Sequence, residues 1–100
     1  MLAALHIHHE HIVDFCHRWG IVELALFGSV LSDSFGPDSD IDVLVTFAPD
    51  ARWDLFDLVS MADELESIFG RHVDLVEAGA IRNPFRRQSI FDSKRVIHAA

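Results

Sequence analysis

The sequence is poor in cysteine and in basic residues, and it has no long apolar run. Cys16 is the single cysteine among 100 residues, so no disulfide can form within the chain. It falls in a helical pattern, where we expect its side chain to be buried or half-buried. No apolar stretch approaches the roughly 20 residues that span a bilayer, and the first residues lack the basic start and apolar core of a signal peptide. These absences predict a cytoplasmic protein without a membrane segment.

The charge balance is strongly acidic. Eight basic residues stand against sixteen acidic ones, which gives a formal net charge of −8. Proteins that coat nucleic acid usually present a basic face, so we expect no direct nucleic-acid binding. An acidic surface is compatible with a site that gathers divalent cations, and equally with ordinary solubility. Half of the residues are hydrophobic and they are spread along the chain. This composition predicts a single folded domain over residues 1–100.

The hydrophobic pattern predicts alternating helices and strands. Apolar residues at three- and four-residue spacing indicate helices over 4–18 and 52–69, which Gly20 and Gly70 would end. A third helix is expected to begin where Asn83, a capping residue, precedes proline. The expected strands are 21–27, 41–47, 72–76 and an edge strand at 94–97.

The helix over 52–69 has the clearest apolar face. Trp53, Phe56 and Phe69 fall at helical spacing, so we expect them in the core rather than in a platform for base stacking. The apolar face is expected to comprise Leu55, Leu58, Val59, Ala62, Leu65, Ile68 and Phe69.

Asp40 and Asp42 stand at the start of the second expected strand. Side chains alternate along a strand, so these two carboxylates point to the same face. Two neighbouring carboxylates repel each other unless a cation lies between them, and Mg²⁺ is bound by one or two carboxylates together with phosphate oxygens. A bare Asp-x-Asp is more often a solvated turn exit, so the interpretation depends on its context.

That context is Gly28-Ser29, which ends the first expected strand. Glycine lets the backbone approach a ligand closely, and the N–H groups after it can receive phosphate oxygens. The Ser29 hydroxyl can donate as well. Ser39, next to the first aspartate, is a further candidate for nucleotide binding. The whole reads G-S-x10-D-x-D.

This motif, LFGSVLSDSFGPDSDIDVLVTF at 26–47, resembles the polymerase beta-like nucleotidyltransferase superfamily. More narrowly, nearly the entire chain is similar to the minimal nucleotidyltransferases, the MNT antitoxins of HEPN/MNT toxin–antitoxin pairs. The resemblance implies an α/β (α+β) fold with a small mixed sheet and helices packed against it. It also implies a third carboxylate on the strand after the long helix, and Asp74 in HVDLV is the matching position.

The resemblance implies an activity as well. Asp40, Asp42 and Asp74 would hold Mg²⁺, two ions in all, while Gly28 and Ser29 position the phosphates of ATP. The chain would act as a type VII-like antitoxin that transfers AMP to a tyrosine of a cognate HEPN-family RNase toxin and thereby silences it. Two alternatives stay open, namely a non-catalytic antitoxin that acts by docking alone and a small-molecule nucleotidyltransferase. The apolar C-terminal strand could also pair with another chain.

The loop within the motif departs from the family pattern. Many relatives carry arginines there, whereas this chain has Ser32, Ser34 and Gly36 at those places. Positive charge would have to come from Mg²⁺ or from residues elsewhere. The candidates are Arg82, Arg86, Arg87 and Lys94.

Several histidines near the start invite a metal interpretation. His8 and His11 are three apart and would share a helix face. Zinc sites need further ligands at defined spacing, and none stand nearby. Solvated helix histidines are therefore the favoured interpretation of His6, His8, His9, His11 and His17.

Overall fold

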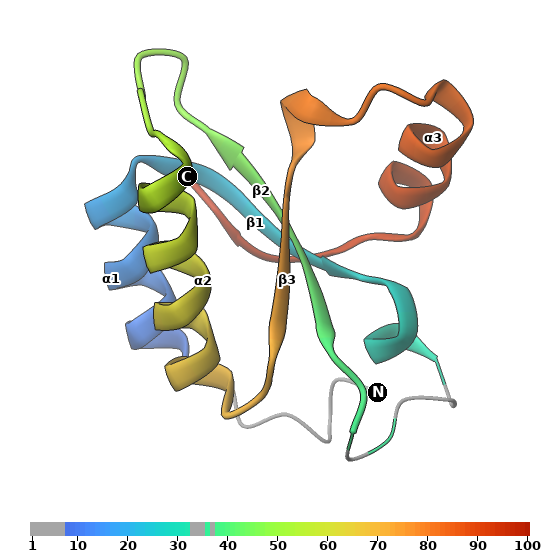
Figure 1. Ribbon diagram of the computed structural model, residues 1–100, viewed down its shortest axis with the longest axis horizontal. Coiled ribbons are helices and arrows are strands. Elements are labelled where there is room, and N and C mark those ends of the chain that lie inside the picture. The colour runs from blue at the N-terminus through green and yellow to red at the C-terminus, as the bar shows by residue number, and fades with distance from the viewer. Residues whose placement is uncertain (1–7, 33–35, 37) are drawn as a thin grey trace.

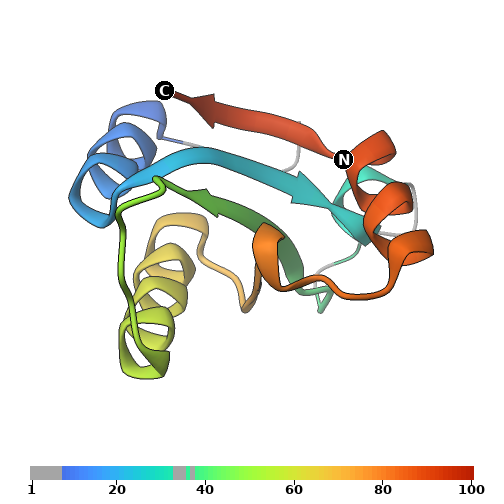
Figure 2. The ribbon, with the colours of Figure 1, turned by 90° about the horizontal axis from the view of Figure 1, so that it is seen from above.

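The fold is a mixed four-stranded sheet with helices on both faces (Figures 1 and 2). A computed structural model describes residues 8–32, 36 and 38–100. The elements are α1 (His9–Trp19), β1 (Ile21–Phe27), the short 3₁₀ turn η2 (Gly28–Leu31), β2 (Ile41–Phe47), α2 (Leu55–Phe69), β3 (Val73–Glu77), the turn η3 (Ala78–Ala80), α3 (Pro84–Ser93) and β4 (Arg95–Ala99).

The strands lie in the order β3-β2-β1-β4. Strand β1 is antiparallel to both β2 and β4, whereas β2 is parallel to β3. A parallel pair needs a crossover connection, and α2 provides it. The predicted element order and the mixed sheet are confirmed, and β4 is an edge strand as expected. The last strand begins at Arg95 rather than Lys94, which follows the end of α3.

Two apolar cores cover the two faces of the sheet. Ile41, Val43 and Val45 of β2 are fully buried against α1 and α2, in the larger cluster. Leu44, which points to the other face, belongs to a smaller cluster with Ile90 of α3. Because β2 alternates between these two cores, every second side chain of β2 faces α3. The buried side chains of α1 are Ile12, Phe15 and Cys16, so the prediction for the cysteine is confirmed.

The predicted helix over 52–69 begins later, at Leu55. Asp54 is its N-cap, and its side chain accepts from the Asp57 N–H at 2.9 Å. The Asp57 side chain in turn accepts from the Asp54 N–H at 3.0 Å. This reciprocal capping box holds Asp54 in extended backbone, so residues 52–54 cannot be helical. The end at Gly70 and the Asn83 cap of α3 agree with prediction.

The predicted apolar face of α2 is partly wrong. Phe69 is in the core, but Leu55, Phe56 and Val59 are 73%, 81% and 52% exposed. The buried stripe instead includes Met61, which was not among the residues expected there. Only one side of the helix lies on the sheet, and the first half of α2 is apolar on both sides, so periodicity could not say which side is covered.

The predicted start of the first helix at residue 4 falls outside the described residues. The described part of α1 begins at His9 and ends at Gly20, which adopts the left-handed conformation that closes many helices. Within residues 8–32, 36 and 38–100, no helix is both long and apolar enough to cross a bilayer.

Candidate active site

The two aspartates of the motif lie where β2 begins. Asp42 is within the strand and half-buried, and Asp40 immediately precedes the strand and is exposed. Ile41 and Val43 face the larger core. The Asp42 side chain therefore points to the opposite face, beneath α3.

Strand β3 brings Asp74 beside Asp42. The two strands are parallel, and their register pairs Asp42 directly with Asp74. Neighbouring strands lie about 4.8 Å apart, and directly paired residues point to the same face. The sheet thus places two carboxylates from distant segments next to each other.

Gly28 completes this corner of the sheet from the other side of β2. The register pairs Phe27 with Asp42, so Gly28 follows directly beside the carboxylate. Its φ is +76°, a conformation that side chains rarely adopt. A Cβ added there would lie 3.2 Å from Asp42 Cγ and would overlap Oδ2. Glycine is needed here because the backbone passes against the Asp42 carboxylate, and the half-exposed Ser29 follows at the same corner.

The electrostatics of this corner are unfavourable for a bare carboxylate. Burial raises the pKa of Asp42, and the negative charges of Asp74 and Asp40 raise it further. Arg86 offsets part of this increase. The three predicted carboxylates therefore interact, and Asp42 is the centre of the group. Its charged form is disfavoured unless positive charge is supplied.

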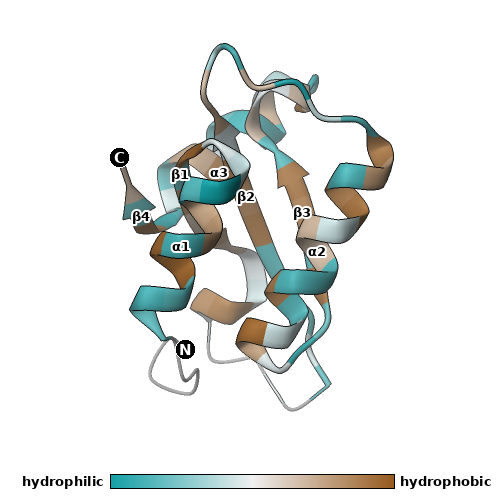
Figure 3. Ribbon diagram, turned by 90° about the vertical axis from the view of Figure 1, so that its left-hand side faces the viewer, coloured by the Kyte–Doolittle hydropathy of each residue, from teal (hydrophilic) through white to brown (hydrophobic). Residues whose placement is uncertain are grey.

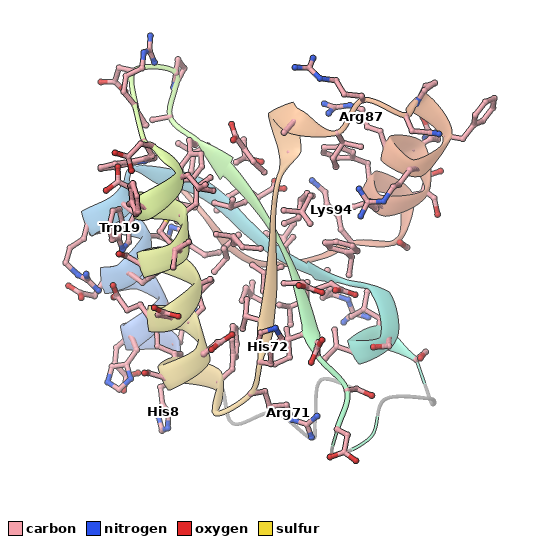
Figure 4. All side chains as sticks on the ribbon, in the orientation of Figure 1. His8, Trp19, Arg71, His72, Arg87 and Lys94 are labelled. Atoms are coloured by element: carbon pink, nitrogen blue, oxygen red, sulfur yellow. The ribbon has the colours of Figure 1, made fainter. Side chains whose placement is uncertain are left out.

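The charge of Arg86, in α3, lowers the pKa of Asp42. The sequence left four basic residues as candidates to supply positive charge, and the structure gives three of them different surroundings. Arg87 donates from Nη1 to the Ala78 carbonyl at 2.6 Å, and Lys94 pairs with Glu23. Arg86 lies one helical turn before the buried Ile90, on the side of α3 that faces the sheet. Figure 4 shows Arg87 and Lys94 beside α3.

Arg71, in the turn after α2, hydrogen-bonds to the loop between η2 and β2. Its Nη1 donates to the Gly36 carbonyl at 2.6 Å and to the Ser39 carbonyl at 3.2 Å. The Ser39 hydroxyl accepts from the Gly36 N–H at 3.0 Å. Sequence reasoning missed Arg71, because nothing in its spacing connects the turn after α2 with the motif loop. Ser39 shapes the backbone that leads into Asp40, and Ser34 falls outside the described residues.

The carboxylates of this corner suit a hard cation whose remaining ligands are phosphate oxygens. Among residues 8–32, 36 and 38–100, no three histidine, cysteine or carboxylate side chains gather closely enough to enclose a metal ion. The described histidines belong to no such group either, although the rings of His8 and His11 are 5.3 Å apart. His6 lies outside the described residues. An open carboxylate pair is what Mg²⁺ requires when phosphate oxygens and water complete its shell.

A cavity of about 380 Å³ lies elsewhere, at the opposite end of β2. Thr46, Trp53, Leu58 and Glu77 are among its lining residues, and none of the carboxylates of the motif is. We place the chemistry at the carboxylate corner because the interacting charged groups are there.

Comparison with known proteins gives consistent matches. The family model described as nucleotidyltransferase domain matches residues 9–97. A Methanocaldococcus jannaschii protein, provisionally named as a protein adenylyltransferase, is 36% identical over 73% of this chain and 72% of its own length. Protein adenylyltransferase MntA of Thermococcus cleftensis is 30% identical over the same shares.

Solved structures share the fold. A crystal structure of a toxin–antitoxin with AMP-PNP aligns with a TM-score of 0.74 at 21% identity, covering 94% of this chain and 75% of that one. A second structure contains a tri-AMPylated Shewanella oneidensis HEPN toxin in complex with an MNT antitoxin. It aligns with a TM-score of 0.65 at 20% identity over 92% of this chain and 70% of that one.

Proposed function

The chain belongs to the nucleotidyltransferase-domain family, and on that premise we propose that it is a protein adenylyltransferase antitoxin. It transfers AMP from ATP to a tyrosine of a cognate HEPN-family RNase toxin and so neutralises the toxin. The observation that carries this proposal is the direct pairing of Asp42 with Asp74 beside the bare backbone of Gly28. The two relatives named as protein adenylyltransferases support the protein acceptor.

The carboxylates have the first role. The paired carboxylates Asp42 and Asp74, joined by Asp40 when the ion binds, would hold Mg²⁺, which would neutralise charge on the triphosphate. The raised pKa of Asp42 supports this role, because a cation would relieve the repulsion that Asp74 and Asp40 impose. Asp74 is exposed, so its carboxylate is also open to an incoming hydroxyl.

The backbone after β1 positions the phosphates. Gly28 keeps the space beside Asp42 free of a side chain, and Ser29 offers its N–H and hydroxyl. Ser39 contributes to nucleotide binding through the loop that it closes with Gly36 and Arg71. Arg86 replaces the missing loop arginines, because its charge already acts at Asp42.

In the reaction, the tyrosine oxygen forms a bond to the α-phosphorus of ATP. The bond between that phosphorus and the oxygen bridging to the β-phosphate breaks, and pyrophosphate leaves with the electron pair. The hydroxyl proton passes to the Asp74 carboxylate. Such a transfer mainly needs alignment and charge neutralisation, which this corner offers.

The test uses ATP labelled at the α-phosphate, Mg²⁺ and the purified cognate HEPN-type protein that the proposal requires. We expect label on a tyrosine of that protein and at least a hundredfold slower transfer by Asp42→Asn, as is common when a site loses an essential charged group. Asp50→Asn, an exposed carboxylate in the loop after β2, is the matched control and should transfer normally. Transfer by Asp42→Asn at the wild-type rate would refute the proposed site.

A second candidate is neutralisation by docking alone. The described loop residues Ser32 and Gly36 carry no positive charge, and the first turn of α2 exposes apolar side chains that suit a protein contact. The double variant Asp40→Ala/Asp42→Ala separates the two candidates in a toxin-protection assay in cells. Full protection would favour docking, and loss of protection would favour AMP transfer.

A further inference from the structure

Among the residues that the structure describes, the largest group of exposed apolar side chains lies at the start of α2. Leu55, Phe56 and Val59 are 73%, 81% and 52% exposed, and Trp53 just before them is 37% exposed. Their spacing places Leu55 and Val59 one turn apart, with Phe56 beside them. Figure 3 shows hydrophobic colouring at the end where α2 begins. We call these four residues the α2 surface.

Hydrogen bonds fix the Trp53 side chain and the start of the helix that carries the α2 surface. The Trp53 indole N–H donates to the Trp19 carbonyl at 2.9 Å, and the two indole rings meet edge to face with centroids 5.0 Å apart. The Asp54–Asp57 capping box fixes the start of the helix. The cavity of about 380 Å³ adjoins this surface, since Trp53 and Leu58 line it.

The helix that carries most of the α2 surface bears no positive charge, and Arg52, the basic residue just before Trp53, donates to the Pro49 and Ala51 carbonyls. Residues 55–69 contain no lysine, arginine or histidine. Glu64 pairs with Arg18, and Glu66 with His72. Asp63, one turn beyond Val59, is an exposed carboxylate on the same side of the helix. A partner must therefore combine an apolar stripe with positive charge.

This chemistry argues against α2 of a second copy as the occupant. Two α2 helices packed on each other through this surface would bring their exposed Asp63 side chains into the interface, and like charges across an interface are costly. A helix with an apolar stripe flanked by lysine or arginine matches both the shape and the sign, because apolar stripes on two helices pack together.

We propose that the α2 surface is the docking site for a basic amphipathic helix of the toxin partner, an inference that rests on the proposed function. The α2 surface lies on the outer side of α2, away from the sheet. Helix α2 covers the face of the sheet opposite to Asp42 and α3. A partner held there leaves the carboxylate corner open to ATP. Docking and AMP transfer are thus separate properties of the chain.

The test measures binding of the purified cognate HEPN-type protein to this chain, by biolayer interferometry without ATP. We expect Phe56→Asp and Val59→Ser each to raise the Kd at least about tenfold, as central interface side chains commonly do. Phe85→Asp is the matched control, because Phe85 is 84% exposed on α3 and should bind within about twofold of wild type. Asp63→Lys should also weaken binding, since it reverses the charge that attracts the partner.

Several outcomes would overturn the inference. They are no binding by the wild type, unchanged binding by both α2 variants, a loss confined to Phe85→Asp, or tighter binding by Asp63→Lys. A wild-type dimer in light scattering that Phe56→Asp converts to a monomer would make this surface a self-interface instead. AMP transfer to the toxin is measured separately. If the wild type transfers AMP and Phe56→Asp binds the toxin as tightly as the wild type does, the docking site alone is refuted. If the α2 variants weaken binding but the wild type transfers no AMP, the proposed function alone is refuted.

Discussion

Replacing Asp42 by asparagine should stabilise the metal-free protein while abolishing its response to Mg²⁺. Asp42 and Asp74 are directly paired on neighbouring strands, about 4.8 Å apart. Two unit charges at that distance repel by about 1 kcal/mol at the dielectric constant of water and by about 3 kcal/mol at an effective value of 20. Asp42 is half-exposed, so the lower part of this range applies. We expect Asp42→Asn to raise the free energy of unfolding by about 1–2 kcal/mol.

The sign of the pH dependence follows from the raised pKa of Asp42. A carboxyl whose pKa is higher in the folded state than in the unfolded state destabilises the fold once it ionises. The penalty is absent below the unfolded pKa of about 3.9 and grows as the pH rises through the folded pKa. The free energy of unfolding of Asp42→Asn should therefore exceed that of the wild type by most at neutral pH, and this difference should shrink towards pH 4.

Differential scanning calorimetry at pH 7 tests this. In EDTA, Asp42→Asn should melt higher by roughly 4–8 °C per kcal/mol, the range for a domain of this size. Mg²⁺ should raise the Tm of the wild type and leave that of the variant nearly unchanged, because binding to the folded state alone stabilises it. Asp50→Asn should behave as the wild type in both conditions. A lower Tm for Asp42→Asn in EDTA, or an equal response to Mg²⁺, would refute the reasoning.

Three further predictions concern single side chains. Gly28→Ala should destabilise the fold by about 1–3 kcal/mol in urea denaturation and remove AMP transfer, because its φ is positive and its Cβ would overlap Asp42; normal stability and transfer would contradict the close approach. Burial raises the pKa of Cys16 to about 12, so the thiol should not react with Ellman's reagent at pH 8 until the protein is denatured; rapid reaction of the native protein would show that the thiol is accessible. Arg86→Ala should raise the KM for ATP about tenfold while Arg82→Ala, also exposed, leaves it unchanged; equal effects would show that Arg86 has no special position.

Local sequence determined the elements and the motif. Strands 21–27 and 41–47 were predicted with their exact ends, because apolar residues in short runs bounded by turn residues indicate strands directly. The cap of α3 was readable because Asn83 and Pro84 act within their own turn. Gly28-Ser29 and Asp40-x-Asp42 were recognisable for the same reason, since their spacing is a property of one continuous segment.

Tertiary structure decided how distant segments meet. The parallel register of β2 and β3 brings Asp74 to Asp42, whereas in the sequence Asp74 stood out only through a family resemblance. Helix α3 packs on the sheet through Ile90 and carries Arg86, whose charge lowers the pKa of Asp42, and the turn after α2 places Arg71 on the motif loop.

Dependence on contacts between distant segments also explains the wrong prediction for the apolar face of α2. Periodicity predicted an apolar helix but placed Phe56 in the core, and the structure leaves Phe56 exposed on the outer side. A helix whose first turns are apolar on two sides can cover the sheet with only one of them. Which side is covered depends on contacts between residues far apart in the chain, and these exist only once the sheet and both of its cores have formed.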